Sequence, residues 1–164
     1  MKASEIKVGG FYHDGKLGVR EVISIEPFDA TYRVTYKILA AKVMQEYSYA
    51  EQKVVSVVGN TTSCTLISFA AWAKKSMTAE ECADLLKIME ARRIKLSPGE
   101  LAVMNSLLNE VGSEDIRTGC MFSINPTENR AVAGLEKKGL VMRDSEEMEI
   151  TQLGEAWFKS ARTA

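Results

Sequence analysis

The chain has 164 residues, of which 46% are hydrophobic and 26% are charged, and its formal net charge is −1. This composition is typical of a soluble globular protein with one domain or two small ones, and no apolar run approaches the roughly 20 residues that span a bilayer. Residues 1–10 lack the apolar stretch of a signal peptide. We therefore expect a cytoplasmic protein that has no contact with a membrane.

The segment up to Met77 has the pattern of a small β-domain. Short β-branched or alternating runs are separated by turn residues, and Asp14-Gly15 is a strong hairpin signal. The expected strands are Val8–Tyr12, Val19–Ile25, Tyr32–Leu39 and Lys53–Val58. Five or so strands in this length favour a small barrel of the Src-homology-3, Tudor or KOW kind over residues 1–77. Residues 69–73 predict a short helix, from which Phe69 and Trp72 would fill the open end of the barrel.

Basic and aromatic residues are interleaved along this segment. Such a mixture suits the stacking of nucleic-acid bases or a peptide groove, and Arg20 and Lys37 are candidates for nucleic-acid binding. Tyrosines at strand positions also cover a barrel core with their hydroxyls at the rim. The strand register decides between these roles, because a shift of one residue exchanges the two faces of a sheet. The tyrosines concerned are Tyr12, Tyr32, Tyr36, Tyr47 and Tyr49.

Capped amphipathic helices are expected from Thr78 onward. Thr78 and Glu81 form a capping box for a helix over residues 79–93, which precedes the three helices of a minimal winged helix. Its apolar face comprises Cys82, Leu85, Leu86 and Met89.

A second capped helix is expected to start at Ser97-Pro98-Gly99-Glu100 and to end at Val111-Gly112. Its predicted inner face comprises Leu101, Met104, Leu107, Leu108 and Val111. A shorter third helix is expected from Ser113 to about Thr118.

The stretch from Asn125 to Thr151 predicts a helix, a tight hairpin and the start of another helix. Asn125 is the expected N-cap, Pro126 suits the first helical position, and Glu128 stands where a capping-box carboxylate reaches back. Gly139 closes the helix, and a hairpin between Leu140 and Ile150 turns at residues 144–147. Apolar residues at helical spacing, Ala131, Val132 and Leu135, predict the inner side of the helix.

The run LEKKGLV, the short hairpin and ITQLGEAW resemble winged-helix regulators of the MarR and PadR type. The resemblance covers roughly the last two fifths of the chain. It implies an α+β protein in which a small β-barrel, residues 1–77, precedes a winged helix-turn-helix domain, residues 78–164. In similar regulators the flanking helices often build a dimer, for which Leu153, Trp157 and Phe158 are candidates here. Alternatively, the helix over residues 79–93 packs the two domains together.

The resemblance places a recognition helix after Asn125. With the apolar side turned inward, the opposite side carries polar residues that suit bases or phosphates, and the hairpin adds Arg143. The candidate nucleic-acid-binding residues are Thr127, Asn129, Arg130, Lys137 and Arg143.

Acidic residues oppose this prediction. Asp144, Glu146 and Glu147 lie at the hairpin tip, and Glu128 and Glu136 lie near the helix surface. Residues 1–77 carry ten basic and seven acidic side chains, whereas residues 78–164 carry eleven and fifteen. The half that resembles a DNA reader is therefore the acidic half, which phosphates would repel.

No catalytic, metal or cofactor site is expected. The motifs of nucleotide-binding loops, zinc proteases and serine hydrolases do not occur, and His13 beside Asp14 is typical of a turn. Cys64, Cys82 and Cys120 have neither CxxC spacing nor nearby histidines. This predicts reduced thiols without a disulfide framework or a zinc site.

The sequence favours a non-enzymatic nucleic-acid-binding or transcription-regulating protein that uses the winged helix, the basic barrel or both. The alternative is a protein-binding accessory factor or inhibitor, in which the acidic winged helix docks on another protein and the barrel adds a second contact. In this alternative the protein would be a phage- or plasmid-encoded factor that acts on host machinery such as a CRISPR complex. Partners are therefore a nucleic acid or a protein, with a homodimer as a further expectation.

Overall fold

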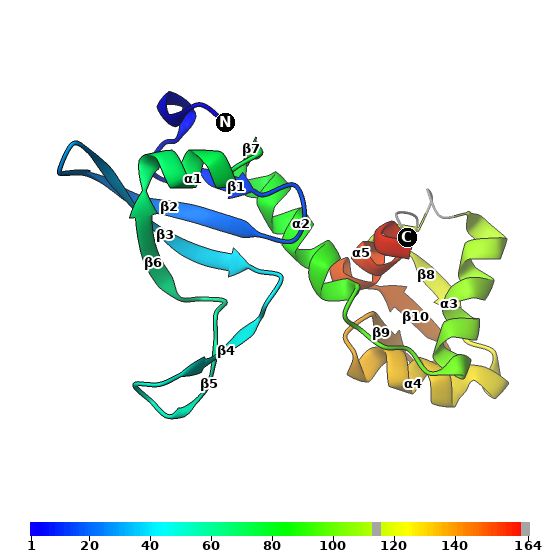
Figure 1. Cartoon of the computed structure of the whole chain (residues 1–164). Helices are drawn as coiled ribbons and strands as arrows, with labels where there is room; N and C mark the ends of the chain where they lie inside the picture. Colours follow the sequence, from blue (N-terminus) through cyan, green and yellow to red (C-terminus); the bar gives the residue numbers. More distant parts are fainter. Residues whose placement is uncertain (113–115, 162–164) are drawn as a thin grey trace. The chain divides into compact units, whose positions relative to one another are not determined.

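The computed structural model describes residues 1–112 and 116–161 and shows a mixed α+β protein (Figure 1). The chain divides into two compact units, Met1–Leu86 and Lys87–Ala164. The division falls inside the helix α2, Ala79–Ala91, whose N-terminal hydrogen bonds join Thr78 and Glu81 as the capping box predicts.

The first unit is built on a five-stranded antiparallel sheet in the order β6-β3-β2-β1-β7. Its strands are β1 (Phe11–His13), β2 (Val19–Phe28), β3 (Thr31–Ala40), β6 (Thr61–Thr65) and β7 (Lys75–Met77). Two register shifts interrupt the pairing of β2 with β3, and bulges of this kind bend a strand. Strands β6 and β7 form the two edges of the sheet.

Two expectations for the strands are wrong in detail. The first strand begins at Phe11 instead of Val8, because Gly9 adopts a positive φ of 75° in a preceding turn. The run expected at Lys53–Val58 does not join the main sheet. Instead β5 (Lys53–Ser56) pairs only with β4 (Gln45–Ser48), as a separate ribbon that extends away from the sheet (Figure 1).

The core of the first unit lies between the sheet and the helix α1, Leu66–Trp72, which crosses one face of the sheet (Figure 1). Phe69 is fully buried, and its ring centroid lies 5.5 Å from that of Tyr12 and 5.2 Å from that of Tyr36. The tyrosine rings of Tyr12 and Tyr36 therefore belong to the core. One turn of 3-10 helix, η1 (Ala3–Glu5), precedes the sheet.

The second unit combines helices with a three-stranded antiparallel sheet in the order β8-β10-β9. After α3 (Pro98–Val111) follow β8 (Met121–Ser123), the 3-10 turn η2 (Pro126–Glu128), α4 (Asn129–Lys137), β9 (Val141–Asp144), β10 (Glu147–Ile150) and α5 (Gln152–Ala161). The predicted hairpin between Leu140 and Ile150 is present, and Ser145 takes a positive φ of 52° in its turn.

The core of the second unit confirms Val132 and Leu135 on the inner side of α4, whereas Ala131, also expected there, is only partly buried. It corrects the inner side of α3. Val132 and Leu135 are fully buried. On α3, Leu101 and Val111 are 41% and 38% exposed, whereas Val103, which was not expected inside, is buried. The buried side of α3 is thus rotated about the helix axis from the expected one, and Val103, Met104 and Leu107 pack into the core.

Two further expectations concern the ends of this unit. Residues 113–115 of the predicted third helix lie outside the described residues, and the residues that follow, Ile116 and Arg117, are not helical. Phe158 was a candidate for a dimer contact but is buried in the core of its own unit, with Leu153 and Trp157 packed against that core.

Candidate nucleic-acid interface

The start of α4 is set by Asn125. Its side-chain oxygen accepts hydrogen bonds from the backbone N–H of Thr127 (3.1 Å) and from the Thr127 hydroxyl (2.9 Å), which caps η2. Glu128 does not act as the predicted capping-box carboxylate, because the chain makes a 3-10 turn there and α4 begins only at Asn129. Thr127 is therefore held at the helix entrance.

A groove with a volume of about 670 Å³ runs along the outer side of α4 and the N-terminal end of α3. Arg130 and Lys137 line it, both are exposed, and neither makes a hydrogen bond or ion pair with another residue of the described ranges. Small residues of α4, namely Ala131, Ala133 and Gly134, form its lining between these two cations. The groove thus offers two free positive charges, seven residues apart on one helix side.

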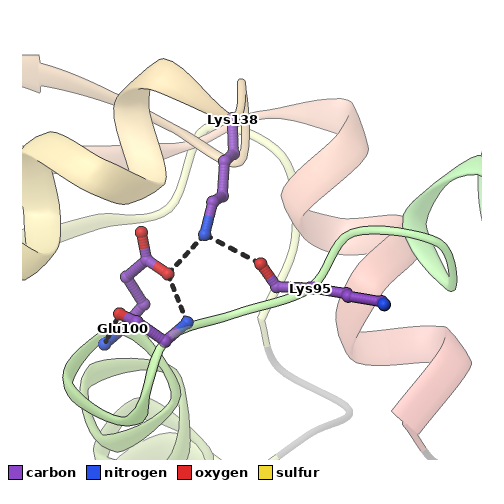
Figure 2. Close-up of polar contacts among 4 residues, drawn as sticks. Lys95, Glu100 and Lys138 are labelled. Atoms are coloured by element: carbon purple, nitrogen blue, oxygen red, sulfur yellow. Dashed lines mark hydrogen bonds and ion pairs between the residues drawn. The ribbon is translucent and has the colours of Figure 1, made fainter.

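At the base of this groove, an ion pair joins the buried carboxylate of Glu100 to the partly exposed Lys138 (Figure 2). Glu100 Oε2 accepts hydrogen bonds from Lys138 Nζ and from the backbone N–H of Ser97 (2.6 Å), while Lys138 Nζ also donates to the carbonyl oxygen of Lys95 (2.8 Å). The hydrogen bond from Lys138 keeps the pKa of Glu100 below its usual value, although burial acts in the opposite direction. The pair ties α3 to the end of α4.

Gly134 lies where Glu100 meets α4. A Cβ atom at this glycine would lie 2.2 Å from Glu100 Oε1 and 3.1 Å from its carboxyl carbon. The carboxyl group thus lies directly against the backbone of α4, and a larger residue at position 134 would force the Glu100 side chain to move.

Asn129 and Arg143, two other candidates, are engaged with each other. Arg143 Nη2 donates to Asn129 Oδ1 at 2.8 Å, and Asn129 Nδ2 donates to the carbonyl oxygen of Pro126 at 3.1 Å. A bidentate contact with adenine would need both of these amide atoms. Asn129 is therefore better described as the residue that positions Arg143 beside α4.

The tip of the β9–β10 hairpin is acidic, as the sequence indicates. Asp144, Glu146 and Glu147 are all exposed there. Their charge opposes phosphate binding at the tip, whereas Arg143 lies nearer to α4.

Thr151 and Gly154 join the hairpin to α5. The Thr151 hydroxyl donates to the carbonyl oxygens of Gly139 (2.6 Å) and Leu140 (3.0 Å) and accepts from the N–H of Gly154 (3.1 Å). A Cβ at Gly154 would lie 2.1 Å from the Leu140 carbonyl oxygen. The Thr-x-x-Gly step therefore locks the start of α5 against the end of α4.

Arg20 and Lys37, the candidates in the first unit, lie on opposite faces of the sheet. Arg20 pairs with Ile38 and the next residue, Glu21, pairs with Lys37. Successive strand residues point to opposite sides, and Arg20 stacks on Tyr36 on the side of α1. No single surface joins these two cations.

The turn expected at residues 13–16 begins one residue later, because His13 is the last residue of β1 and pairs with Val19. Asp14 Oδ1 accepts hydrogen bonds from the backbone N–H groups of Lys16 (2.7 Å) and Gly18 (2.9 Å), and His13 Nε2 lies 3.2 Å from the Lys16 carbonyl oxygen. Among the residues in the described ranges, no group of three or more His, Cys, Asp or Glu side chains could hold a metal ion.

Sequence reasoning missed the groove because it missed the partner of Glu100. The motif Ser97-Pro-Gly-Glu100 was identified as a capping box, and both of its hydrogen bonds are present. Its contact with Lys138 joins residues 38 positions apart. Spacing within one helix cannot indicate such a contact.

No helix among residues 1–112 and 116–161 has the length and apolar character needed to cross a membrane. No protein-family model, curated protein or solved structure matches the chain.

Proposed function

We propose that the C-terminal unit is a nucleic-acid-binding module that holds phosphate groups in the groove beside α4. The observation that carries this proposal is the pair of exposed and unpaired cations, Arg130 and Lys137, on one side of α4. Phosphates are bound by such side chains, and nearby backbone N–H groups at a helix start add to the attraction. Thr127 and the N-terminal end of α3 border the same groove.

In this proposal the unit is a winged helix, with α4 as the recognition helix and β9–β10 as the wing. Three features support it: the order of helix, hairpin and helix, the three-stranded sheet β8-β10-β9, and the Thr151–Gly154 step. The small-barrel assignment of the first unit is also proposed, because the two register shifts in β2 favour a curved sheet.

The positions of Arg143 and of the acidic hairpin tip indicate how each would contribute to nucleic-acid binding. Arg143 is held by Asn129 at the base of the wing, so it would meet the phosphate backbone next to α4. The acidic tip, with Glu146 and Glu147, would point away from phosphates or limit affinity. Sequence reading would then rest mainly on Arg130, which can form two hydrogen bonds with guanine.

The decisive experiment is the binding of labelled random duplex DNA and RNA to the full chain at two salt concentrations. Phosphate contacts release counterions, so the association constant must fall steeply as salt rises. Anisotropy titrations measure this slope directly. A complete lack of binding at low salt, or an affinity that salt does not change, would contradict the proposal.

A second candidate function is protein docking through the β4–β5 ribbon. Tyr49 is 88% exposed, and its ring centroid lies 5.2 Å from that of Tyr47, which is also exposed and pairs with exposed Val54. Exposed tyrosines of this kind are typical of the centres of protein interfaces.

Photo-crosslinking tests this second candidate. A photoreactive residue at Tyr49 should give a protein adduct in cells, whereas one at Thr61, exposed on the edge strand β6, serves as the matched control. Equal labelling at both positions, or none at Tyr49, would count against docking through the ribbon.

A further inference from the structure

The first unit contains a pocket that none of the proposed contacts uses. Its volume is about 250 Å³, and it lies where β2 and β3 meet the residues that enter the β4–β5 ribbon. Its polar lining comprises Asp14, Arg20, Lys42 and Glu46. Its apolar lining comprises Ile38, Ala40, Val43, Val57 and Trp72.

Arg20 is held in this pocket by two aromatic rings. Its guanidinium carbon lies 3.9 Å from the ring centroid of Trp72 and 4.4 Å from that of Tyr36. Stacking of this kind fixes the plane of the guanidinium group. Arg20 forms no hydrogen bond or ion pair with any residue of the described ranges, so its N–H donors remain available to a ligand.

The backbone around Arg20 allows it to lie between the two rings. Gly18 also lines the pocket and lets Trp72 approach, because a Cβ there would lie 2.9 Å from Trp72 Cζ2 and 2.7 Å from Asp14 Oδ2. The strand pairing of Arg20 with Ile38 places both residues on the side of α1. The free edge of a planar guanidinium matches a carboxylate through two parallel hydrogen bonds.

The other lining residues indicate which oxyanion fits. Lys42 adds a second positive charge, and the carboxylates of Asp14 and Glu46 balance the two cations. These four charges sum to zero, so a monocarboxylate leaves the pocket with one net negative charge, whereas a doubly charged phosphate leaves it with two and is repelled more strongly by both carboxylates. The aliphatic side chains provide contacts for an apolar body.

We propose that this pocket binds a small monocarboxylate with an apolar body, whose carboxylate forms a pair of hydrogen bonds with Arg20. Lys42 supplies further positive charge at the entrance, and Trp72 and the aliphatic residues enclose the body of the ligand. The small volume restricts the ligand to about the size of one amino acid or one aromatic acid. This site is independent of the groove beside α4.

The experiment uses the ¹⁵N-labelled full chain and follows the Trp72 indole N–H and the Gly18 amide by NMR. The probes are isobutyrate and benzoate, with benzamide as the neutral analogue and inorganic phosphate as the competing oxyanion. We expect saturable shifts of both signals at millimolar concentrations of the two acids, and much weaker effects of benzamide and phosphate.

Three variants sharpen this test. Arg20→Gln should weaken the binding of benzoate about 10- to 100-fold, because it removes a charged pair of hydrogen bonds. The matched control is Arg33→Gln, since Arg33 also stacks on an aromatic ring (Phe28, 3.7 Å) but does not line the pocket. Glu46→Gln should tighten binding, because it removes a negative charge from an exposed residue of the lining.

The opposite results would overturn the proposal. They are the lack of a saturable shift with either acid, equal binding of benzamide or phosphate, and undiminished binding by folded Arg20→Gln. If Arg20→Gln does not fold, Glu46→Gln decides, because unchanged or weaker binding of benzoate in that variant contradicts a carboxylate in this pocket.

Discussion

The inner and outer sides of α4 differ in how their side chains are held. On the inner side, Val132 and Leu135 are fully buried, and beyond the C-terminal end of the helix Lys138 is held by an ion pair with Glu100. On the outer side, Arg130 and Lys137 are exposed and unpaired within the described ranges. Packing therefore determines one side, whereas the other is left free for a ligand. Substitutions on the two sides should affect different properties.

The largest effect is expected on the inner side. Leu135→Ala should lower the free energy of unfolding by about 2 to 5 kcal/mol, because it removes a fully buried side chain and leaves a cavity. Denaturant unfolding measures this loss. A loss well below that range would mean that the neighbouring residues fill the space and that the inner side is less tightly packed than the buried fraction indicates.

The ion pair should matter somewhat less. Lys138→Met leaves the Glu100 carboxylate buried without its charged partner and should cost about 2 to 3 kcal/mol, less than a fully buried pair because the Lys138 side chain is 32% exposed. The matched control is Lys137→Met on the exposed side, which should change stability by no more than about 0.5 kcal/mol. Equal losses in the two variants would remove the distinction between the paired and the unpaired lysine.

The outer side should control binding. Arg130→Ala and Lys137→Ala should each weaken nucleic-acid binding by roughly 1 to 3 kcal/mol where they touch bases, or lower the salt slope by about one where they touch phosphate, with nearly unchanged stability. The control is Arg117→Ala, an exposed arginine of the same unit that does not line the groove. Binding that depends instead on Arg20 or Lys37 would move the site to the first unit.

The β9–β10 hairpin tests how far the proposed interface extends from α4. Glu146→Lys with Glu147→Lys should raise DNA affinity several-fold by removing repulsion, whereas the same change should damage a protein contact made through the acidic tip. The control is the double variant Glu90→Lys with Glu110→Lys, at exposed positions of α2 and α3, which changes the net charge by the same amount. An equal gain in both double variants would show only a general charge effect.

The smallest effect is expected for a second ion pair, between Glu155 and the exposed Lys159. Hydrogen bonds from Lys159 and Thr118 lower the pKa of Glu155 from 4.5 to about 2. The pKa of Glu155 is lower in the folded than in the unfolded state, so its ionised carboxylate stabilises the fold fully at pH values above the unfolded-state pKa of 4.5. This stabilisation is lost as the pH falls from 4.5 toward 2. Glu155→Gln should cost about 1 kcal/mol or less at neutral pH, given that Lys159 is exposed, and the difference should vanish in unfolding experiments near pH 2.

The sequence by itself determined the local features that depend on neighbouring residues. The capping boxes at Thr78 and Ser97, the hairpin after Leu140 and the inner side of α4 all follow from spacing within one element. Local propensity and hydrophobic period are sufficient for such features. The prediction for the inner side of α3 was wrong, because Val103, Met104 and Leu107 are the α3 residues that pack into the core, and spacing within one helix does not determine this.

Only the tertiary structure decided the features that depend on distant pairs. The pairing of Lys138 with Glu100, the engagement of Asn129 by Arg143, and the stacking of Arg20 on Trp72 join residues far apart in the chain. Arg20 and Lys37 lie on opposite faces of the sheet because of the strand register, and a register shift of one residue would exchange the two faces. The sequence supplied the charged residues of both sites, but the packing of separate elements decided which charges are neutralised and which remain free for a ligand.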